Sequence, residues 1–174
     1  MQELATTFRG TFVRYYRGFQ ALFNELRRTT VRSAPYVEWL AGPTGCGKTR
    51  AAIEEAMALG DFWTSSETFN WFDGYTGQKT AIFDDFRAGV IKFHWLLRIL
   101  DRYPLDTPVK GSFTFWNPER IIITCPRIPQ EEFVNHETGA QYEDIEQLIR
   151  RITVIKRWDD RLKIWIILKD DRPE

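Results

Sequence analysis

The residues best suited to bind phosphate stand together in one short run. Gly42-Pro43-Thr44-Gly45-Cys46-Gly47-Lys48-Thr49 satisfies the pattern G-x-x-x-x-G-K-[ST]. Its glycines allow positive φ and bring backbone N–H groups close to phosphate oxygens, and a helix starting near Lys48 directs its positive dipole end at the same anions. Lys48 is expected to reach the β- and γ-phosphates, and the Thr49 hydroxyl to ligate Mg²⁺. The run predicts a nucleotide-phosphate site.

Two adjacent carboxylates form the second group of reactive residues. Asp84 and Asp85 follow the apolar run at residues 80–83, which reads as a strand. We expect Asp84 to hold Mg²⁺ through Thr49 or a bound water, and Asp85 to orient or deprotonate the attacking water. Because one carboxylate can serve the metal while the other serves water, the pair favours hydrolysis over binding alone.

The elements that position these residues follow from the hydrophobic pattern. Strands are predicted at 36–41, 61–64, 80–83 and 119–124, and helices at 48–59, 90–100 and 143–151. A hairpin is expected around Gly111, from 107–110 and 112–116, and another from 153–158 and 162–168. This alternation predicts an α/β fold, with a largely parallel sheet and helices on both faces.

The first 34 residues have a different character. They hold six arginines against two glutamates, and their aromatic residues and leucines recur at helical spacing from about residue 6 to 28. One amphipathic helix, or two short ones, is therefore expected. Packing on its own domain, oligomerisation and nucleic-acid contact all remain open for this segment. We assign residues 1–34 to a helical oligomerisation element and 35–174 to the nucleotide-binding domain.

Composition limits the classes of protein that the chain can represent. Its 174 residues are 43% hydrophobic and 28% charged, as in a globular domain. Lys+Arg and Asp+Glu both number 24, which argues against coating nucleic acid through bulk positive charge. Two cysteines, Cys46 and Cys125, are too few for a disulfide framework. With no signal-peptide pattern and no membrane-spanning apolar run, a soluble intracellular protein without a membrane partner is expected.

Several short motifs, taken in order, resemble one known family. Besides 42–49 they are Trp71-Phe72-Asp73-Gly74-Tyr75, Ile82-Phe83-Asp84-Asp85-Phe86, Leu100-Asp101-Arg102-Tyr103-Pro104-Leu105, Val109-Lys110-Gly111 and Ile121-Ile122-Ile123-Thr124. Together they resemble the superfamily-3 helicase domain of replication-initiator (Rep) proteins from circular single-stranded DNA viruses, with circoviruses nearest. The resemblance implies a P-loop NTPase fold of the ASCE/AAA+-like type. It also implies a hexameric motor that uses ATP and Mg²⁺ to move 3′ to 5′ along single-stranded DNA in rolling-circle replication, in the host nucleus.

The resemblance assigns roles to three further basic residues. Lys110 matches a hairpin lysine that projects into the central pore and grips the DNA backbone. A basic residue beside a glycine turn can also approach phosphate closely on physical grounds. Arg150 and Arg151 match paired arginines, one of which stabilises the transferring phosphoryl group in the neighbouring subunit. Six copies of one lysine can line a pore while each subunit stays neutral.

Two departures from the family are visible. Pro126 stands where the third motif usually has an asparagine that contacts the γ-phosphate, and proline offers neither an amide nor a backbone N–H. Either Thr124, Cys125 or a neighbouring residue takes over the role of this asparagine, or hydrolysis is slow. The N-terminal nicking endonuclease domain of such proteins is absent from this chain, whose isolated His94 and His136 do not resemble its metal ligands.

Two alternative functions, and the role of one group of aromatic residues, stay open at this level. A P-loop nucleotide kinase shares the phosphate loop, and a module that binds ATP only to fix ring assembly is compatible with Pro126. The aromatic residues Trp71, Phe72 and Tyr75 are suited either to stacking on the nucleotide base or to core packing.

Overall fold

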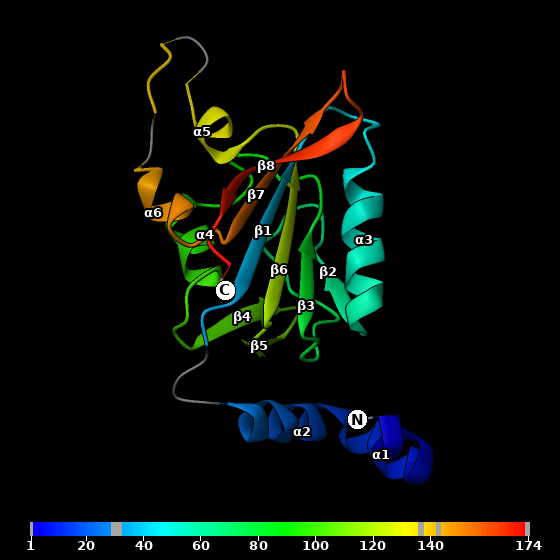
Figure 1. Cartoon of the computed structure of the whole chain (residues 1–174). Coiled ribbons are helices and arrows are strands. Elements are labelled where there is room, and N and C mark those ends of the chain that lie inside the picture. The colour runs from blue at the N-terminus through cyan, green and yellow to red at the C-terminus, as the bar shows by residue number, and fades with distance from the viewer. Residues whose placement is uncertain (1, 29–32, 136–137, 142–143, 173–174) are drawn as a thin grey trace.

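The computed structural model describes residues 2–28, 33–135, 138–141 and 144–172. Figure 1 shows a twisted sheet with helices at its sides and a separate helical segment below it. The helices are α1 (Gln2–Thr7), α2 (Arg9–Arg27), α3 (Lys48–Leu59), α4 (Phe93–Ile99), α5 (Pro129–Glu132) and α6 (Glu146–Ile149). The strands are β1 (Tyr36–Ala41), β2 (Phe62–Thr64), β3 (Thr80–Phe83), β4 (Leu105–Val109), β5 (Ser112–Trp116), β6 (Arg120–Cys125), β7 (Val154–Asp159) and β8 (Ile164–Asp170).

The main sheet has the strand order β2-β3-β6-β1-β7-β8. The five strands from β2 to β7 in this order run parallel, and the edge strand β8 pairs antiparallel with β7. Strand β6 lies between β1 and β3, with Ala41 beside Cys125 and Phe83 beside Ile123. Because carboxyl ends of parallel strands share one edge, residues that follow β1, β3 and β6 meet there. The predicted α/β fold with a largely parallel sheet is confirmed.

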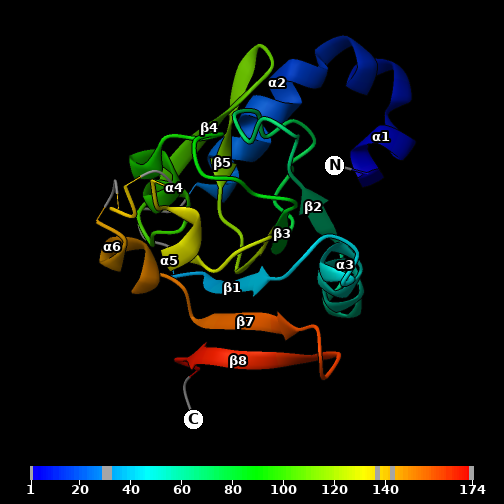
Figure 2. The ribbon, with the colours of Figure 1, turned by 90° about the horizontal axis from the view of Figure 1, so that it is seen from above.

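The two faces of the sheet bury alternate residues of each strand, as the period of two in a strand requires. Leu40, Ile82 and Ile122 pack against Ala52 and Ala56 of α3. Their neighbours along the strands, such as Trp39, Phe83 and Ile123, belong to the larger cluster, which includes α4 and residues of the β4–β5 hairpin. In Figure 2, α3 lies to one side of the sheet, and α4 and the hairpin lie to the other. Helices therefore cover both faces, and the hairpin completes the second layer.

An aromatic cluster joins the hairpin to the sheet. The ring of Trp63 lies 5.3 Å from that of Phe72 and 5.6 Å from that of Trp116, centroid to centroid. Phe72 and Tyr75 are 0% and 1% exposed, so they are core residues and base stacking is excluded for both. Trp71 beside them is exposed.

The N-terminal helices contact the rest of the chain through the hairpin. The helical pattern predicted from about residue 6 to 28 is present as α1 and α2, with a kink at Tyr15. Asn24 Nδ2 donates to the carbonyl of Phe113 at 3.1 Å, and Arg28 Nη2 donates to both carboxylate oxygens of Asp106 at 2.9 and 3.0 Å. Of the assigned element 1–34, residues 1 and 29–32 lie outside the described residues.

Many large apolar side chains of this segment remain exposed. They are Phe8, Val13, Tyr15, Tyr16, Leu22 and Leu26. Such a surface on a short helical segment marks an interaction site more often than a free monomer surface. Within the described ranges, every helix is too short or too polar to cross a membrane.

Most predicted elements have the expected bounds, and the differences have local causes. The helix predicted at 90–100 is shorter because Val90 donates to the Arg87 carbonyl in a turn and Lys92 has extended backbone, so α4 begins at Phe93. The helix predicted at 143–151 is reduced to α6, and residue 143 lies outside the described part. Helix α5 was not predicted, although Pro129 at its first turn followed by two glutamates is a start signal.

Candidate functional site

The loop between β1 and α3 has the backbone that a phosphate cradle requires. Gly45 and Gly47 have φ of 84° and 90°, a region that L side chains rarely enter. At Gly42 a Cβ atom would lie 2.7 Å from Trp158 Cβ and 2.8 Å from Cys46 Sγ, so a side chain does not fit. Gly47 is also the N-cap of α3, whose first N–H groups face the loop.

Lys48 lies beneath this loop and is 8% exposed. Its ammonium Nζ donates to the carbonyls of Gly42 at 2.8 Å and Pro43 at 2.9 Å. A buried ammonium needs such acceptors, and here the loop itself supplies them. The loop and its lysine therefore hold each other in place, with the positive charge at the base of the cradle.

Three side chains from three elements meet at one carboxylate oxygen. Thr49 Oγ1 on α3 donates to Asp84 Oδ1 at 2.8 Å, and Thr124 Oγ1 at the end of β6 donates to the same oxygen at 2.7 Å. Thr124 Oγ1 also accepts the backbone N–H of Asp85 at 2.8 Å. Hydrogen bonds to an ionised carboxylate are among the stronger ones. Thr124, near the end of β6, thus fixes the orientation of both acidic residues.

The second carboxylate, that of Asp85, is oriented by an unusual backbone conformation. Asp85 has φ of 54°, in the left-handed region that aspartate tolerates better than most residues. Its carboxylate Oδ1 forms an ion pair with Arg87 Nη1 at 2.8 Å. Asp84 and Asp85 therefore have different partners, the first two hydroxyls and the second a guanidinium.

These groups line one cavity of about 490 Å³. Its walls are Thr44, Gly45, Gly47, Lys48, Thr49, Arg50, Asp84, Asp85 and Arg87. A volume of this size is in the range of small-molecule and cofactor sites. The structure thus brings most of the predicted phosphate loop together with both acids, while Gly42 and Pro43 act through their carbonyls on Lys48.

One residue of this site, Arg87, was not among the predicted ones, and it follows the paired acids by two positions. Thr124, which ends an apolar β-branched run, was named only as one of several possible substitutes for the asparagine missing at Pro126. Nothing in the local pattern distinguishes Arg87 from a surface arginine. Its place in the cavity depends on the left-handed turn at Asp85.

The two cysteines lie near the same end of the sheet. Cys46 packs beside Gly42, and Cys125 is the register partner of Ala41. Burial raises the pKa of the Cys125 thiol to about 12. That thiol is therefore protonated at neutral pH, and both cysteines are free. A packing role fits them better than a redox role.

The paired arginines lie away from this cavity. They lie between α6 and β7. Thr153, which directly precedes β7, donates its N–H to the carbonyl of Val37, so this segment lies near the start of β1. The phosphate loop leaves the opposite end of β1. Arg151 is paired with Asp101, Nη2 to Oδ2 at 2.8 Å, whereas Arg150 is exposed. Neither lines the cavity of its own chain.

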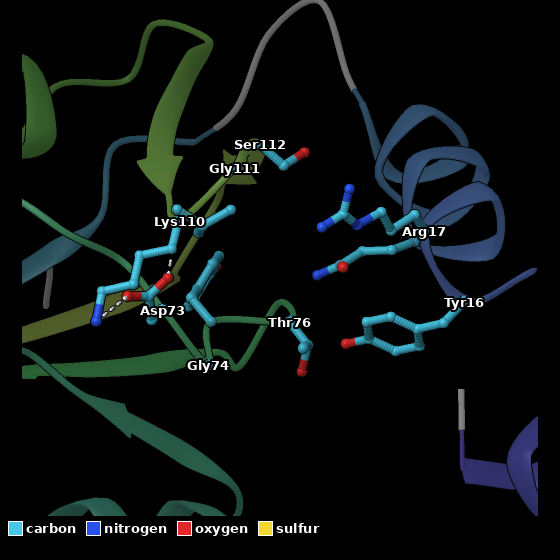
Figure 3. A pocket seen from close by; sticks show the side chains of 11 residues that line it. Tyr16, Arg17, Asp73, Gly74, Thr76, Lys110, Gly111 and Ser112 are labelled. Atoms are coloured by element: carbon cyan, nitrogen blue, oxygen red, sulfur yellow. Dashed lines mark hydrogen bonds and ion pairs between the residues drawn. The ribbon is translucent and has the colours of Figure 1, made fainter. Parts of the chain in front are cut away.

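Lys110 occupies the turn of the β4–β5 hairpin, next to Gly111 with φ of 80°. Its backbone N–H donates to Asp73 Oδ1 at 2.8 Å, and its ammonium lies 3.8 Å from Asp73 Oδ2. The side chain is 80% exposed. In Figure 3 it points toward Asp73 and away from Tyr16 and Arg17 of α2, which face the hairpin across a cavity of about 370 Å³.

Of the two histidines, only His94 lies among the described residues, and it lines neither site. His94 is exposed on α4 and lines neither the phosphate cavity nor the cavity beside Lys110, and His136 lies outside the described residues. Among the residues that the structure describes, no group of three or more His, Cys, Asp or Glu side chains could hold a metal ion.

Comparison with known proteins agrees with this geometry. The family model described as RNA helicase matches residues 38–126, from β1 to the end of the third motif. The replication-associated protein of Porcine circovirus 1 is 34% identical over 158 residues, which is 89% of this chain and 48% of the relative. That of Canary circovirus is 31% identical over 159 residues, 91% of this chain and 51% of the relative.

A third relative gives the same picture. The replication-associated protein of Porcine circovirus 2 is 34% identical over 149 residues, 85% of this chain and 46% of the relative. The chain spans about half the length of these relatives. With a phosphate loop, paired acids and a hairpin lysine in the matched order, the chain belongs to the RNA helicase family, as a superfamily-3 helicase domain of the kind found in circovirus replication initiators.

Proposed function

We propose that this chain is the motor of a viral replication initiator, which hydrolyses ATP and moves 3′ to 5′ along single-stranded DNA in rolling-circle replication in the host nucleus. The observation that carries the proposal is the common cavity of Lys48, Thr49, Asp84 and Asp85. A phosphate-binding lysine, a hydroxyl–carboxylate pair and a second carboxylate are the parts that phosphoryl transfer to water requires.

The site suits ATP with Mg²⁺ as its cofactor. Mg²⁺ prefers oxygen ligands and is usually held by one or two protein groups together with phosphates and waters. The Thr49 hydroxyl and Asp84 carboxylate, already 2.8 Å apart, form such a pair. When bound, the metal would neutralise charge on the β- and γ-phosphate oxygens.

The residues of the chain have separable tasks in hydrolysis. The loop N–H groups and Lys48 hold the β- and γ-phosphates, exchanging the Gly42 and Pro43 carbonyls for phosphate oxygens. Water attacks the γ-phosphorus, the bond to the β,γ-bridging oxygen breaks, and ADP leaves with that electron pair. Asp85 accepts the proton of the attacking water. Thr124 holds the Asp84 carboxylate and the Asp85 backbone in position through its two hydrogen bonds.

Assembly into a hexameric ring is part of the proposal. The exposed apolar side chains of Phe8 and α2 supply a surface for a second copy, which supports assigning 1–34 to oligomerisation and 35–174 to the ATPase domain. Arg150 is exposed and distant from its own cavity, as an arginine acting on a neighbouring subunit must be.

DNA contact is assigned to Lys110 at the hairpin turn. Its side chain is 80% exposed, and its only ion-pair partner among the described residues is Asp73 at 3.8 Å. A DNA phosphate can replace so loose a partner at little cost. The net charge of zero excludes coating of DNA but not a ring of single lysines.

One experiment separates this proposal from its alternatives. Phosphate release is measured with Mg²⁺ and ATP, with and without single-stranded DNA, and with single-stranded RNA of the same sequence. Stimulation by DNA is the expected result. A nucleotide kinase would instead transfer phosphate to a nucleoside monophosphate, and an assembly module would bind ATP without release. Either of those results, with no stimulation by DNA, contradicts the motor function.

A further inference from the structure

Arg87 has an unusual position for a residue outside the recognised motifs. It lines the phosphate cavity, two residues after the paired acids, and its side chain is 38% exposed. Its Nη1 donates to the Phe86 carbonyl at 2.9 Å and is paired with Asp85 Oδ1 at 2.8 Å. One edge of the guanidinium is thus anchored beside the acid that we assign to the attacking water.

The opposite edge of the same guanidinium is unengaged. Within the described ranges no hydrogen bond involves Arg87 Nε or Nη2. A guanidinium carries five donors in a rigid planar fork that matches phosphate oxygens. A cation anchored on one side and open on the other, at the wall of a phosphate cavity, is well placed to contact an anion.

Other donors on this wall are already used or absent. The Thr124 hydroxyl donates to Asp84, and Pro126 has no donor at all. Arg50 also lines the cavity, but its side chain is 81% exposed and pairs with Glu54 along α3. An asparagine at the Pro126 position would contact the γ-phosphate. On the side of the cavity formed by Asp84 and Asp85, neither Thr124 nor Pro126 offers a donor for that contact.

We propose that Arg87 binds the γ-phosphate in the cavity of its own chain and takes the place of the missing asparagine. The inference rests on the proposed function, because it takes ATP as the nucleotide. The open edge of the guanidinium, with Nε and Nη2, meets the γ-phosphate while Nη1 stays paired with Asp85. Because ADP has no γ-phosphate, it does not make this contact.

The first test compares the affinity for two nucleotides. The full chain with Mg²⁺ is titrated with ADP and with a non-hydrolysable β,γ-imido analogue of ATP. Arg87→Ala should weaken analogue binding by about tenfold and ADP binding by less than about twofold. Arg87→Lys, which keeps the charge but loses the fork, should fall between. Equal effects on the two nucleotides, or none, overturn the proposal.

A matched control is available at the same end of the sheet. Arg127 is 47% exposed, pairs with Glu132 at 3.4 Å and does not line the cavity. Arg127→Ala removes an arginine side chain of similar exposure from outside the cavity, so it should leave both nucleotide affinities unchanged. A loss in this variant equal to that in Arg87→Ala would mean that general charge, not contact, is responsible, and would overturn the proposal.

The second test separates contact with the phosphate from mere support of Asp85. If Arg87 only holds Asp85, its removal has no effect on analogue affinity once Asp85→Asn is present. If Arg87 contacts the γ-phosphate, its removal still weakens analogue binding by about tenfold in the Asp85→Asn background. Both tests measure binding, so they remain valid even if the wild-type chain released no phosphate. In that case the hydrolysis proposal would fail and the Arg87 contact would still be decided.

Discussion

Arg151 and Asp101 form a partly buried ion pair, with Nη2 and Nε of the arginine 2.8 and 3.2 Å from Oδ2 of the aspartate. Their side chains are 19% and 21% exposed. Arg151 Nη1 also donates to the Gln147 carbonyl at 2.6 Å, so the guanidinium ties the end of α6 to the segment after α4. The two neighbouring arginines thus differ: Arg151 joins two segments of its own chain, whereas Arg150 is exposed, and under the proposed function Arg150 is the one that acts on another subunit.

Substitution of the two arginines should therefore have different consequences. Arg150→Ala should lower phosphate release by about a hundredfold or more without lowering the melting temperature. Arg151→Ala should lower the free energy of unfolding by about 1–3 kcal/mol, because Asp101 loses its partner. Mixing Arg150→Ala with Lys48→Ala chains should restore activity in part, because some interfaces then pair an intact phosphate loop with an intact Arg150. No recovery in the mixture would contradict action between subunits.

The same ion pair predicts a dependence of stability on pH. Burial alone raises the pKa of Asp101, but hydrogen bonds from Arg151 and the Arg102 backbone outweigh it and hold the pKa below its ordinary 3.8. The stabilisation is therefore complete above 3.8 and lost as the pH falls through the lower folded value. Asp101→Asn should reduce the fall in melting temperature between pH 5 and pH 2. If the melting temperature of Asp101→Asn falls as much between pH 5 and pH 2 as that of the wild type, Asp101 does not contribute to the loss of stability in acid.

Lys48→Ala should abolish nucleotide turnover, with a loss of at least about a hundredfold, because the γ-phosphate loses its charge partner. Thr49→Ser is the matched conservative change, since it keeps the hydroxyl that donates to Asp84, and it should retain most activity. Phosphate release is measured for both, with circular dichroism to confirm folding. Turnover unchanged in Lys48→Ala would refute the phosphate-loop assignment.

Lys110→Ala should weaken binding of single-stranded DNA by about fivefold and reduce the dependence of affinity on salt. Lys79 is a suitable control, because its side chain is 75% exposed and pairs with Glu119, and it lies outside the hairpin. Lys79→Ala should bind DNA as the wild type does. Equal affinity of the two variants at one fixed salt concentration would remove Lys110 from the DNA contact.

Asp73→Asn should shift DNA affinity in the opposite direction. The amide keeps an oxygen to accept the Lys110 backbone N–H, now 2.8 Å from Oδ1, but no longer attracts the ammonium. We expect tighter DNA binding at low salt, measured by fluorescence anisotropy. Weaker binding would mean that the Asp73 charge helps to position the lysine rather than competes with the phosphate.

The sequence determined the local elements and the main chemical groups. The bounds of β1, α3 and β3 follow from buried runs and from a helix-forming composition after the glycine loop. The phosphate loop was found because its contacts depend on residues close together in the chain, and the paired acids because they directly follow an apolar run. Such features are encoded by neighbours, so a single sequence is sufficient to predict them.

Tertiary structure decided which distant side chains meet. Hydrophobic periodicity contains no information on strand order, so only the insertion of β6 between β1 and β3 brings Thr124 to Asp84, 40 residues away along the chain. In the same way, the turn at Asp85 brings Arg87 into the cavity, and packing of α6 beside α4 pairs Arg151 with Asp101. The 24 basic and 24 acidic residues indicate only a neutral chain. Their placement within about 4 Å of particular partners, where Coulomb energies become large, is a property of the fold.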